Sequence, residues 1–177
     1  IDAKKGVPGA LDNATGVTML LLIARVMAEY RGPYGIELVA LNGEDHYAVP
    51  GQLAYLQANS NLAEVCALNI NIDGIGFIDG DTAFSFFGLR SSVLDRAKVK
   101  FSSQTGACEG IQWPQGDHSM FVQSGCPAIA ITSNWLLDNM MTQSITHSDE
   151  DRIDLVDVHR LVSVAQQLKA FVEAIER

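Results

Sequence analysis

Side chains able to bind a metal recur where the apolar segments of this sequence begin or end. Asp12 comes just before one such segment, the pair Glu44 and Asp45 follows a second, and Asp73 follows a third. Carboxylates gathered in one place repel one another unless they are protonated or neutralised by a cation. His147 adds an imidazole, and zinc in hydrolases accepts both oxygen and imidazole ligands. These residues together predict a metal site.

The same residues could support hydrolysis. Two metal ions ~3.5–4 Å apart, bridged by one carboxylate and one water, would lower the pKa of that water and stabilise a tetrahedral intermediate. A carboxylate that is not a ligand must then take the proton of the water, and Glu44, beside Asp45, suits this role of general base. Each motif alone also fits a structural role: Asp12-Asn13 as a helix cap, Asp73-Gly74 as a turn, Glu44-Asp45 as an exposed loop.

The elements that must position these residues alternate between strand and helix. Helices are expected at 15–30, 50–58, 91–101, 117–124 and from Asp154 onward, and strands at 36–41, 65–73, 82–87 and 128–132. The last helix is predicted to begin at Asp154 because Asp154-Leu-Val-Asp157 resembles a capping box. This alternation predicts an α/β fold, a three-layer α-β-α sandwich with a largely parallel central sheet. The ligand crevice of such a fold lies beyond the carboxyl ends of its strands, where the carboxylates fall.

Composition narrows the class of protein. A length of 177 residues fits a single domain, and 47% hydrophobic against 19% charged residues predicts a packed core. The net charge of −9 argues against a nucleic-acid partner, and no apolar run is long enough to predict a membrane segment. Cys66, Cys108 and Cys126 contain no Cys-x-x-Cys pair, so neither a thiolate zinc site nor a disulfide framework is predicted, and at most one disulfide can form. The compartment is left open.

Seven motifs, in order along the whole chain, resemble those of the M28 family of zinc aminopeptidases in the zinc-dependent exopeptidase superfamily. They are Asp2, the stretch GALDNATG at 9–16, Gly43-Glu44-Asp45, Asn71-Ile72-Asp73-Gly74, GDHSMF at 116–121, Gly125-Cys126-Pro127-Ala128 and Thr146-His147-Ser148.

The resemblance implies an aminopeptidase that acts on peptides with two zinc ions in its intact site. By resemblance, Asp12 is the bridging ligand, Asp45 and His147 each bind one of the two ions, Asp73 completes the set and Glu44 is the general base. Asp45 stands where the family more often has Glu.

One departure concerns the start of the chain. Asp2 matches the Asp of the family's His-x-Asp motif, so the ligand His of that motif would precede Ile1. The family also carries strands upstream of that His. We therefore expect residues 1–177 to be one catalytic domain that is incomplete at its N-terminus, to bind metal poorly and to show little peptidase activity. An exposed strand edge would then be covered by another chain or by self-association into a homo-oligomer.

Asp2, Asp117, His118 and Asp151 are expected to support the ligands or to contact substrate. Asp117-His118 could equally be a helix cap with a structural histidine, and Asp151 could orient the imidazole of His147. Other functions remain open on the same scaffold: a carboxypeptidase, for which an arginine cluster is not evident, a glutaminyl cyclase, or a binding domain without catalysis. Retention of mutually repelling carboxylates argues against the binding domain.

Overall fold

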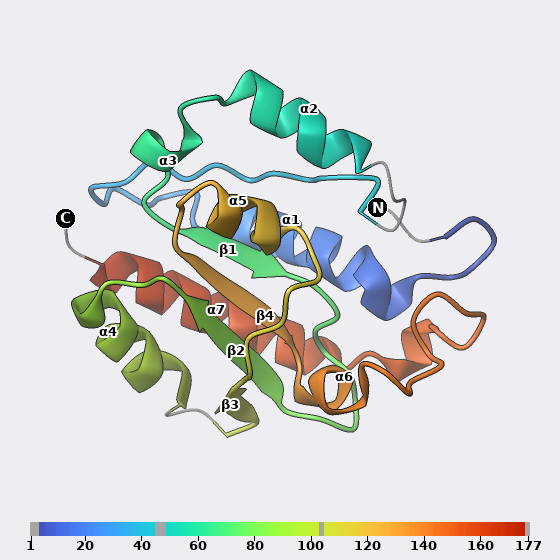
Figure 1. Cartoon of the computed structure of the whole chain (residues 1–177). Coiled ribbons are helices and arrows are strands. Elements are labelled where there is room, and N and C mark those ends of the chain that lie inside the picture. The colour runs from blue at the N-terminus through green and yellow to red at the C-terminus, as the bar shows by residue number, and fades with distance from the viewer. Residues whose placement is uncertain (1–3, 45–48, 103–104, 176–177) are drawn as a thin grey trace.

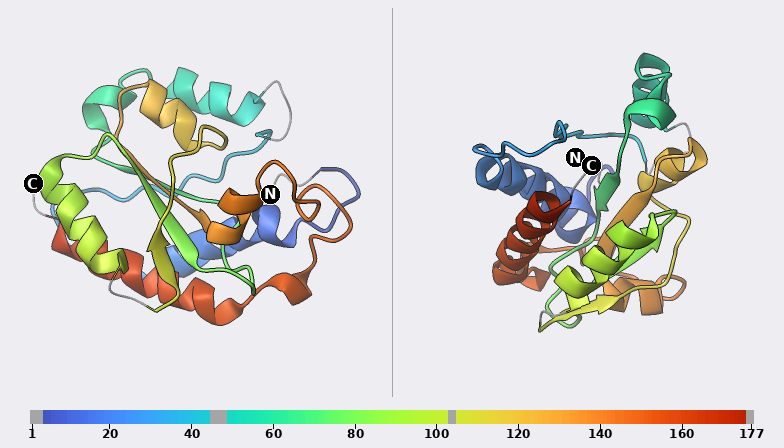
Figure 2. Two further views of the ribbon diagram at one scale, coloured as in Figure 1. Left: turned by 60° about the horizontal axis from the view of Figure 1, so that its bottom comes forward. Right: turned by 90° about the vertical axis from the view of Figure 1, so that its left-hand side faces the viewer.

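A four-stranded sheet forms the centre of the computed structural model, which describes residues 4–44, 49–102 and 105–175. Across the sheet the strands follow the order β1 (Asn69–Ile72), β4 (Ala128–Ser133), β2 (Thr82–Phe87) and β3 (Ala107–Glu109) (Figure 1). The outer pairs β1–β4 and β2–β3 are parallel, and the central pair β2–β4 is antiparallel. Helices cover both faces, which confirms the predicted three-layer sandwich (Figure 2).

The larger core lies between one face of the sheet and three helices, α1 (Thr15–Val26), α4 (Ser91–Ser102) and α7 (Val158–Ala174). Side chains alternate across a strand, so β2 and β4 send Phe84 and Ile131 to this face. Phe84 stacks on Phe101 of α4 with ring centroids 4.1 Å apart, and Phe101 packs against Phe171 of α7 at 5.0 Å. All four side chains are buried, so this face anchors the sheet.

The opposite face carries smaller side chains. Ala83 and Ala130 are fully buried there against Trp113 and Leu137 of α6 (Asn134–Asn139). Beside them lie α5 (His118–Gln123), α2 (Pro50–Ala58) and α3 (Leu62–Val65). Cys66, which ends α3, forms a disulfide with Cys126, which precedes β4, so this layer is covalently attached to the sheet.

Several boundaries differ from the sequence prediction. α1 ends at Val26, and the N-terminal part of the predicted strand 65–73 is not strand, because Val65 belongs to α3. The last helix begins at Val158: the carboxylate of Asp157 accepts the N–H of His159 at 2.9 Å, while Ile153–Leu155 forms a separate 3-10 turn. The short elements β3 and α6 were not predicted, since three to six residues carry little periodic signal.

The predicted strand 36–41 is extended in the structure but is not a strand. In the described part of the chain it forms no backbone ladder with any neighbour. A strand exists only where a second backbone lies about 4.8 Å away, and here a groove separates the segment from β1. Among the described residues, no helix is long and apolar enough to cross a bilayer.

Candidate active site

Two of the predicted metal ligands are in direct contact. The Nε2 atom of His147 lies 2.8 Å from Oδ2 of Asp12, and both side chains are partly open to solvent. Asp12 lies in the kinked turn Ala10–Ala14 that leads into α1, and His147 lies in the loop before α7. His147 has φ of 64°, in the left-handed region that residues other than glycine seldom adopt. The fold thus brings together a carboxylate and an imidazole that are far apart in the sequence.

Asp151 holds these two loops together. Its side chain is fully buried, and its two carboxylate oxygens accept the N–H of Leu11 at 2.6 Å and the N–H of Asp12 at 3.0 Å. Its own carbonyl accepts the N–H of Ala10 at 3.2 Å. From the sequence, orienting the imidazole of His147 was one role considered for this carboxylate. The structure instead places it on the backbone of the turn that carries Asp12, which fixes that turn to the His147 loop.

Asn13 ties the same turn to the sheet. Its Nδ2 donates to the carbonyl of Ile72, the last residue of β1, at 3.0 Å, while its Oδ1 accepts the N–H of Gly16 at 2.7 Å. The helix-capping role considered for Asp12-Asn13 therefore belongs to Asn13, and Asp12 is left to face His147. The sequence indicated Asn13 only as part of a helix cap, because its bond to Ile72 joins residues 59 positions apart that no local pattern relates.

Asp73 stands at the carboxyl end of β1. Its N–H donates to the carbonyl of Ile131 at 3.0 Å, which continues the pairing of β1 with β4 by one residue. The next residue, Gly74, has φ of 65° and turns the chain, and a Cβ there would come within 2.5 Å of Leu136. Because Asn13 attaches the Asp12 turn to Ile72, both carboxylates belong to the same end of β1.

Glu44 follows the extended segment 36–41 and is half-buried. Gly43 before it has φ of 85°, and a Cβ there would lie 2.3 Å from the ring of Pro50, so the turn accepts only glycine. Asp45, His46 and Asp2 lie outside the described residues. Within the described ranges, no three Asp, Glu, His or Cys side chains are arranged to hold a metal ion. The Asp12 and His147 pair has the donor chemistry that zinc accepts, and it fits as part of a larger ligand set.

Asp117 and His118 take different roles at the start of α5. Asp117 makes no capping bond; its Oδ1 accepts the Nε2 of Gln52 at 2.5 Å, which joins α5 to α2. His118 is buried, and its Nε2 lies 2.9 Å from the carbonyl of Trp113, whose ring packs against the imidazole at 4.5 Å. Burial lowers the pKa of His118, partly offset by the bond to the Trp113 carbonyl. This environment favours a neutral structural histidine.

Known proteins resemble the chain in sequence and fold. A "Probable zinc metalloprotease" of Pyrenophora tritici-repentis is 35% identical over 79 residues, which are 43% of this chain and 17% of that protein. An aminopeptidase from Aneurinibacillus sp. strain AM-1 superposes with a TM-score of 0.78 and 22% identity over 96% of this chain and 40% of its own. Glutaminyl cyclase from Bacteroides thetaiotaomicron, bound to N-acetylhistamine, superposes with a TM-score of 0.74 and 19% identity, covering 96% and 64%.

The structural likenesses establish the shared fold, and this chain spans less than half of the aminopeptidase that it resembles. Family membership is established by the sequence itself. The sequence model of peptidase family M28 matches residues 1–172, nearly the whole chain, and includes Asp12, Glu44, Asp73 and His147. The chain therefore belongs to peptidase family M28.

Proposed function

We propose that this chain forms most of the catalytic site of a zinc aminopeptidase, which removes N-terminal residues from peptides. The observation that carries the proposal is the contact between Asp12 and His147 at 2.8 Å, held in place by the buried carboxylate of Asp151. Buried support of this kind for exposed metal-binding side chains is typical of metal sites. Because the chain belongs to peptidase family M28, we assign this supported pair to the hydrolysis of peptides.

In this proposal Asp12, as the bridging ligand, and Asp45, Asp73 and His147 would hold two zinc ions. Bound zinc would lower the pKa of a water molecule and polarise the carbonyl of the scissile bond. Glu44 accepts the proton of that water, because it is a half-buried carboxylate beside the ligand position 45 and is not required as a ligand itself. Asn13 and Asp151 keep the Asp12 turn in place throughout.

The test is the variant Glu44→Gln in the full-length polypeptide. We expect zinc content to stay unchanged and the hydrolysis of an aminoacyl p-nitroanilide to fall ~10²–10⁴-fold, the usual contribution of a general base. Glu29→Gln is the matched control, since the side chain of Glu29 is 93% exposed and pairs with Arg31 at 3.3 Å. Unchanged hydrolysis by Glu44→Gln would refute its role as the base.

Two outcomes separate the aminopeptidase from its alternatives. Cleavage of the free aminoacyl substrate, with no cleavage of its N-acetylated form, would support an exopeptidase that requires a free N-terminus. Release of ammonia from a peptide that begins with glutamine, without cleavage of a peptide bond, would assign a glutaminyl cyclase instead.

A further inference from the structure

The loop before α7 holds His147 in an unusual conformation. The φ of His147, 64°, lies in the left-handed region that residues with a Cβ seldom adopt. Its side chain is 37% exposed, and its Nε2 lies 2.8 Å from Oδ2 of Asp12. Backbone conformations of this kind persist only where surrounding groups determine them. Because the imidazole is open to solvent, the constraint falls to the residues beside it in the loop.

Gln143 supplies this constraint on the N-terminal side of His147. Its Oε1 accepts the N–H of Ile145 at 2.7 Å and the N–H of Thr146 at 3.0 Å. Its Nε2 donates to the hydroxyl of Thr146 at 2.6 Å. All three bonds are partly buried, which reduces competition from water. One side chain thus fixes the two residues that directly precede His147.

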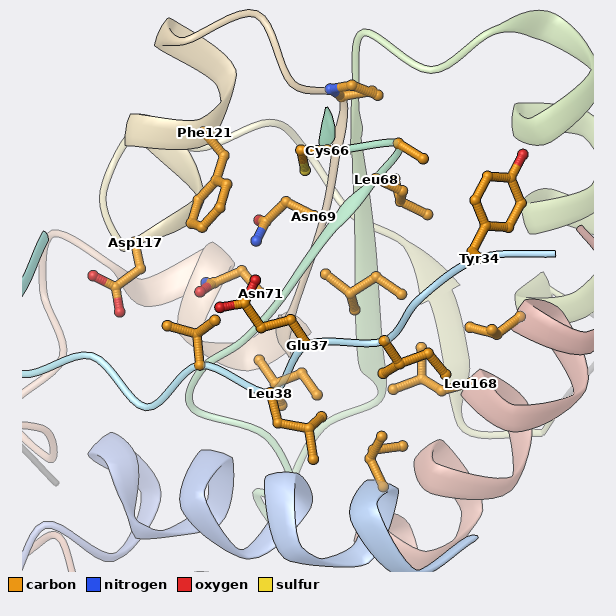
Figure 3. Close-up of a pocket in the computed structure, with 18 of the residues that line it drawn as sticks. Tyr34, Glu37, Leu38, Cys66, Leu68, Asn69, Asn71, Asp117, Phe121 and Leu168 are labelled. Carbon is orange, nitrogen blue, oxygen red and sulfur yellow. The ribbon is translucent and has the colours of Figure 1, made fainter. Parts of the chain in front are cut away.

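Gln143 is itself anchored at the end of α6. The described residues that line the apolar groove between segment 36–41 and β1 (Figure 3) include none from 139–151, so the loop is held elsewhere. The N–H of Gln143 donates to the carbonyl of Asn139, the last residue of α6, at 2.8 Å. The Nδ2 of Asn139 donates to the carbonyl of Trp135 at 2.8 Å. Because α6 follows β4 directly and packs on the sheet through the buried Leu137, the sheet sets the position of Gln143.

Ser148 closes the loop on the C-terminal side of His147. Its hydroxyl lies 2.7 Å from the carbonyl of Ser144 and 2.8 Å from that of Ile145. Its own carbonyl accepts the N–H of Asp151 at 3.2 Å. The C-terminal side is therefore connected to Asp151 and through it to the turn that carries the bridging carboxylate, whereas the N-terminal side relies on the three bonds described above.

We propose that Gln143 is a positioning residue for His147 as a zinc ligand, an inference that rests on the proposed function. Gln143 lies outside the seven motifs identified in the sequence. Its Oε1 is committed to two backbone N–H groups, so it acts through the backbone and not as a ligand. Without these bonds the loop adopts further conformations in which the imidazole leaves Asp12. Zinc affinity then falls in proportion to the fraction of molecules that keep the binding conformation.

The test compares Gln143→Met with Gln143→Glu in the full-length polypeptide. Methionine matches glutamine in length but offers neither the acceptor nor the donor, whereas glutamate keeps an oxygen for both N–H groups and accepts the hydroxyl of Thr146. In competition with a chelator, we expect Gln143→Met to weaken zinc affinity about 10–100-fold and Gln143→Glu to stay within about threefold of the parent protein. Gln166→Met, at an exposed position on α7, is the matched control and should leave zinc affinity unchanged.

Hydrogen exchange in the zinc-free protein, followed by mass spectrometry, reports on the loop without any contribution from the metal. The amides of Ile145 and Thr146 should exchange about tenfold faster in Gln143→Met than in the parent protein, and at the parent rate in Gln143→Glu. The amides of Leu161 and Leu168, buried in the middle of α7, should exchange at the parent rate in both variants.

The outcomes separate this inference from the proposed function. Parent-like zinc affinity in Gln143→Met, or an equal loss in Gln143→Met and Gln143→Glu, would overturn the positioning role and leave the role of Glu44 to its own test. Faster exchange throughout α7 would also overturn it, because the variant would then have lost folding in general. A parent polypeptide that binds no zinc would refute the proposed function, and this inference with it.

Discussion

The variant Asp151→Asn tests whether one buried carboxylate organises the Asp12 turn. The carboxylate of Asp151 accepts two backbone N–H groups, at 2.6 and 3.0 Å, and its side chain has no exposed surface. An asparagine of the same size offers one oxygen and one NH₂ group, so one of the two backbone donors loses its acceptor. Hydrogen bonds to charged groups contribute about 1.5–3 kcal/mol each, and the surviving bond becomes a weaker, uncharged one.

We therefore expect Asp151→Asn to lower the free energy of unfolding by about 2–4 kcal/mol, a large share of the roughly 5–15 kcal/mol typical of a domain. With a urea m-value of about 2–3 kcal/mol/M, the midpoint of urea unfolding, followed by circular dichroism, should fall by about 1 M. Asp149→Asn is the control, because Asp149 is an exposed carboxylate of the same acidic run and should change stability by less than about 0.5 kcal/mol.

The site should respond together with stability. If Asp151 positions Asp12 for metal binding, then Asp151→Asn in the full-length polypeptide should weaken zinc affinity by about 10–100-fold in competition with a chelator. A stability within about 0.5 kcal/mol of the parent protein would refute the reasoning. It would show that neither backbone amide depends on the charge of this carboxylate.

Three further perturbations follow from the structure. The Cys66–Cys126 disulfide spans 60 residues, so its reduction should lower the free energy of unfolding by about 4 kcal/mol. Urea unfolding curves measured with and without dithiothreitol test this, and coincident curves would contradict it. Gly16→Ala should cost about 1–3 kcal/mol, because its Cβ would lie 2.6 Å from a β1 carbonyl, whereas Gly35→Ala meets no atom within 4 Å and should be neutral; equal effects would count against the close packing. Burial lowers the pKa of His118, so the unfolded state binds its proton first, and stability should fall as pH drops below about 6.5 and level off below the folded pKa. His118→Gln should flatten that part of the profile, and an unchanged slope would contradict it.

Much of the fold could be predicted because the local patterns are strong. The apolar positions Leu161, Val164, Leu168 and Phe171 recur at helical spacing and all become buried in α7. The predicted strand 82–87 matches β2, and the predicted helix 50–58 matches α2. The periodic pattern of α7 is long enough to determine its conformation locally, whereas α2 was indicated by Pro50 at its start.

The family could likewise be predicted from the sequence alone, through its motifs. The seven motifs fall within residues 1–172, the range that the family model matches, and none of them needs coordinates to be found. Types and order of residues carried this prediction, because Asp12, Glu44, Asp73 and His147 keep their spacing along the chain whatever the backbone does.

Contacts between distant residues were decided only by the tertiary structure. Leu11 and Asp151 are 140 residues apart, and no local pattern indicates that the Asp151 carboxylate binds the Asp12 turn rather than the His147 imidazole. The antiparallel pairing of β2 with β4 likewise depends on the direction in which the chain enters each strand, which the strand sequences do not indicate. Segment 36–41 is the clearest case: its residues favour a strand, but strand pairing needs a second backbone alongside, and within the described residues none lies there.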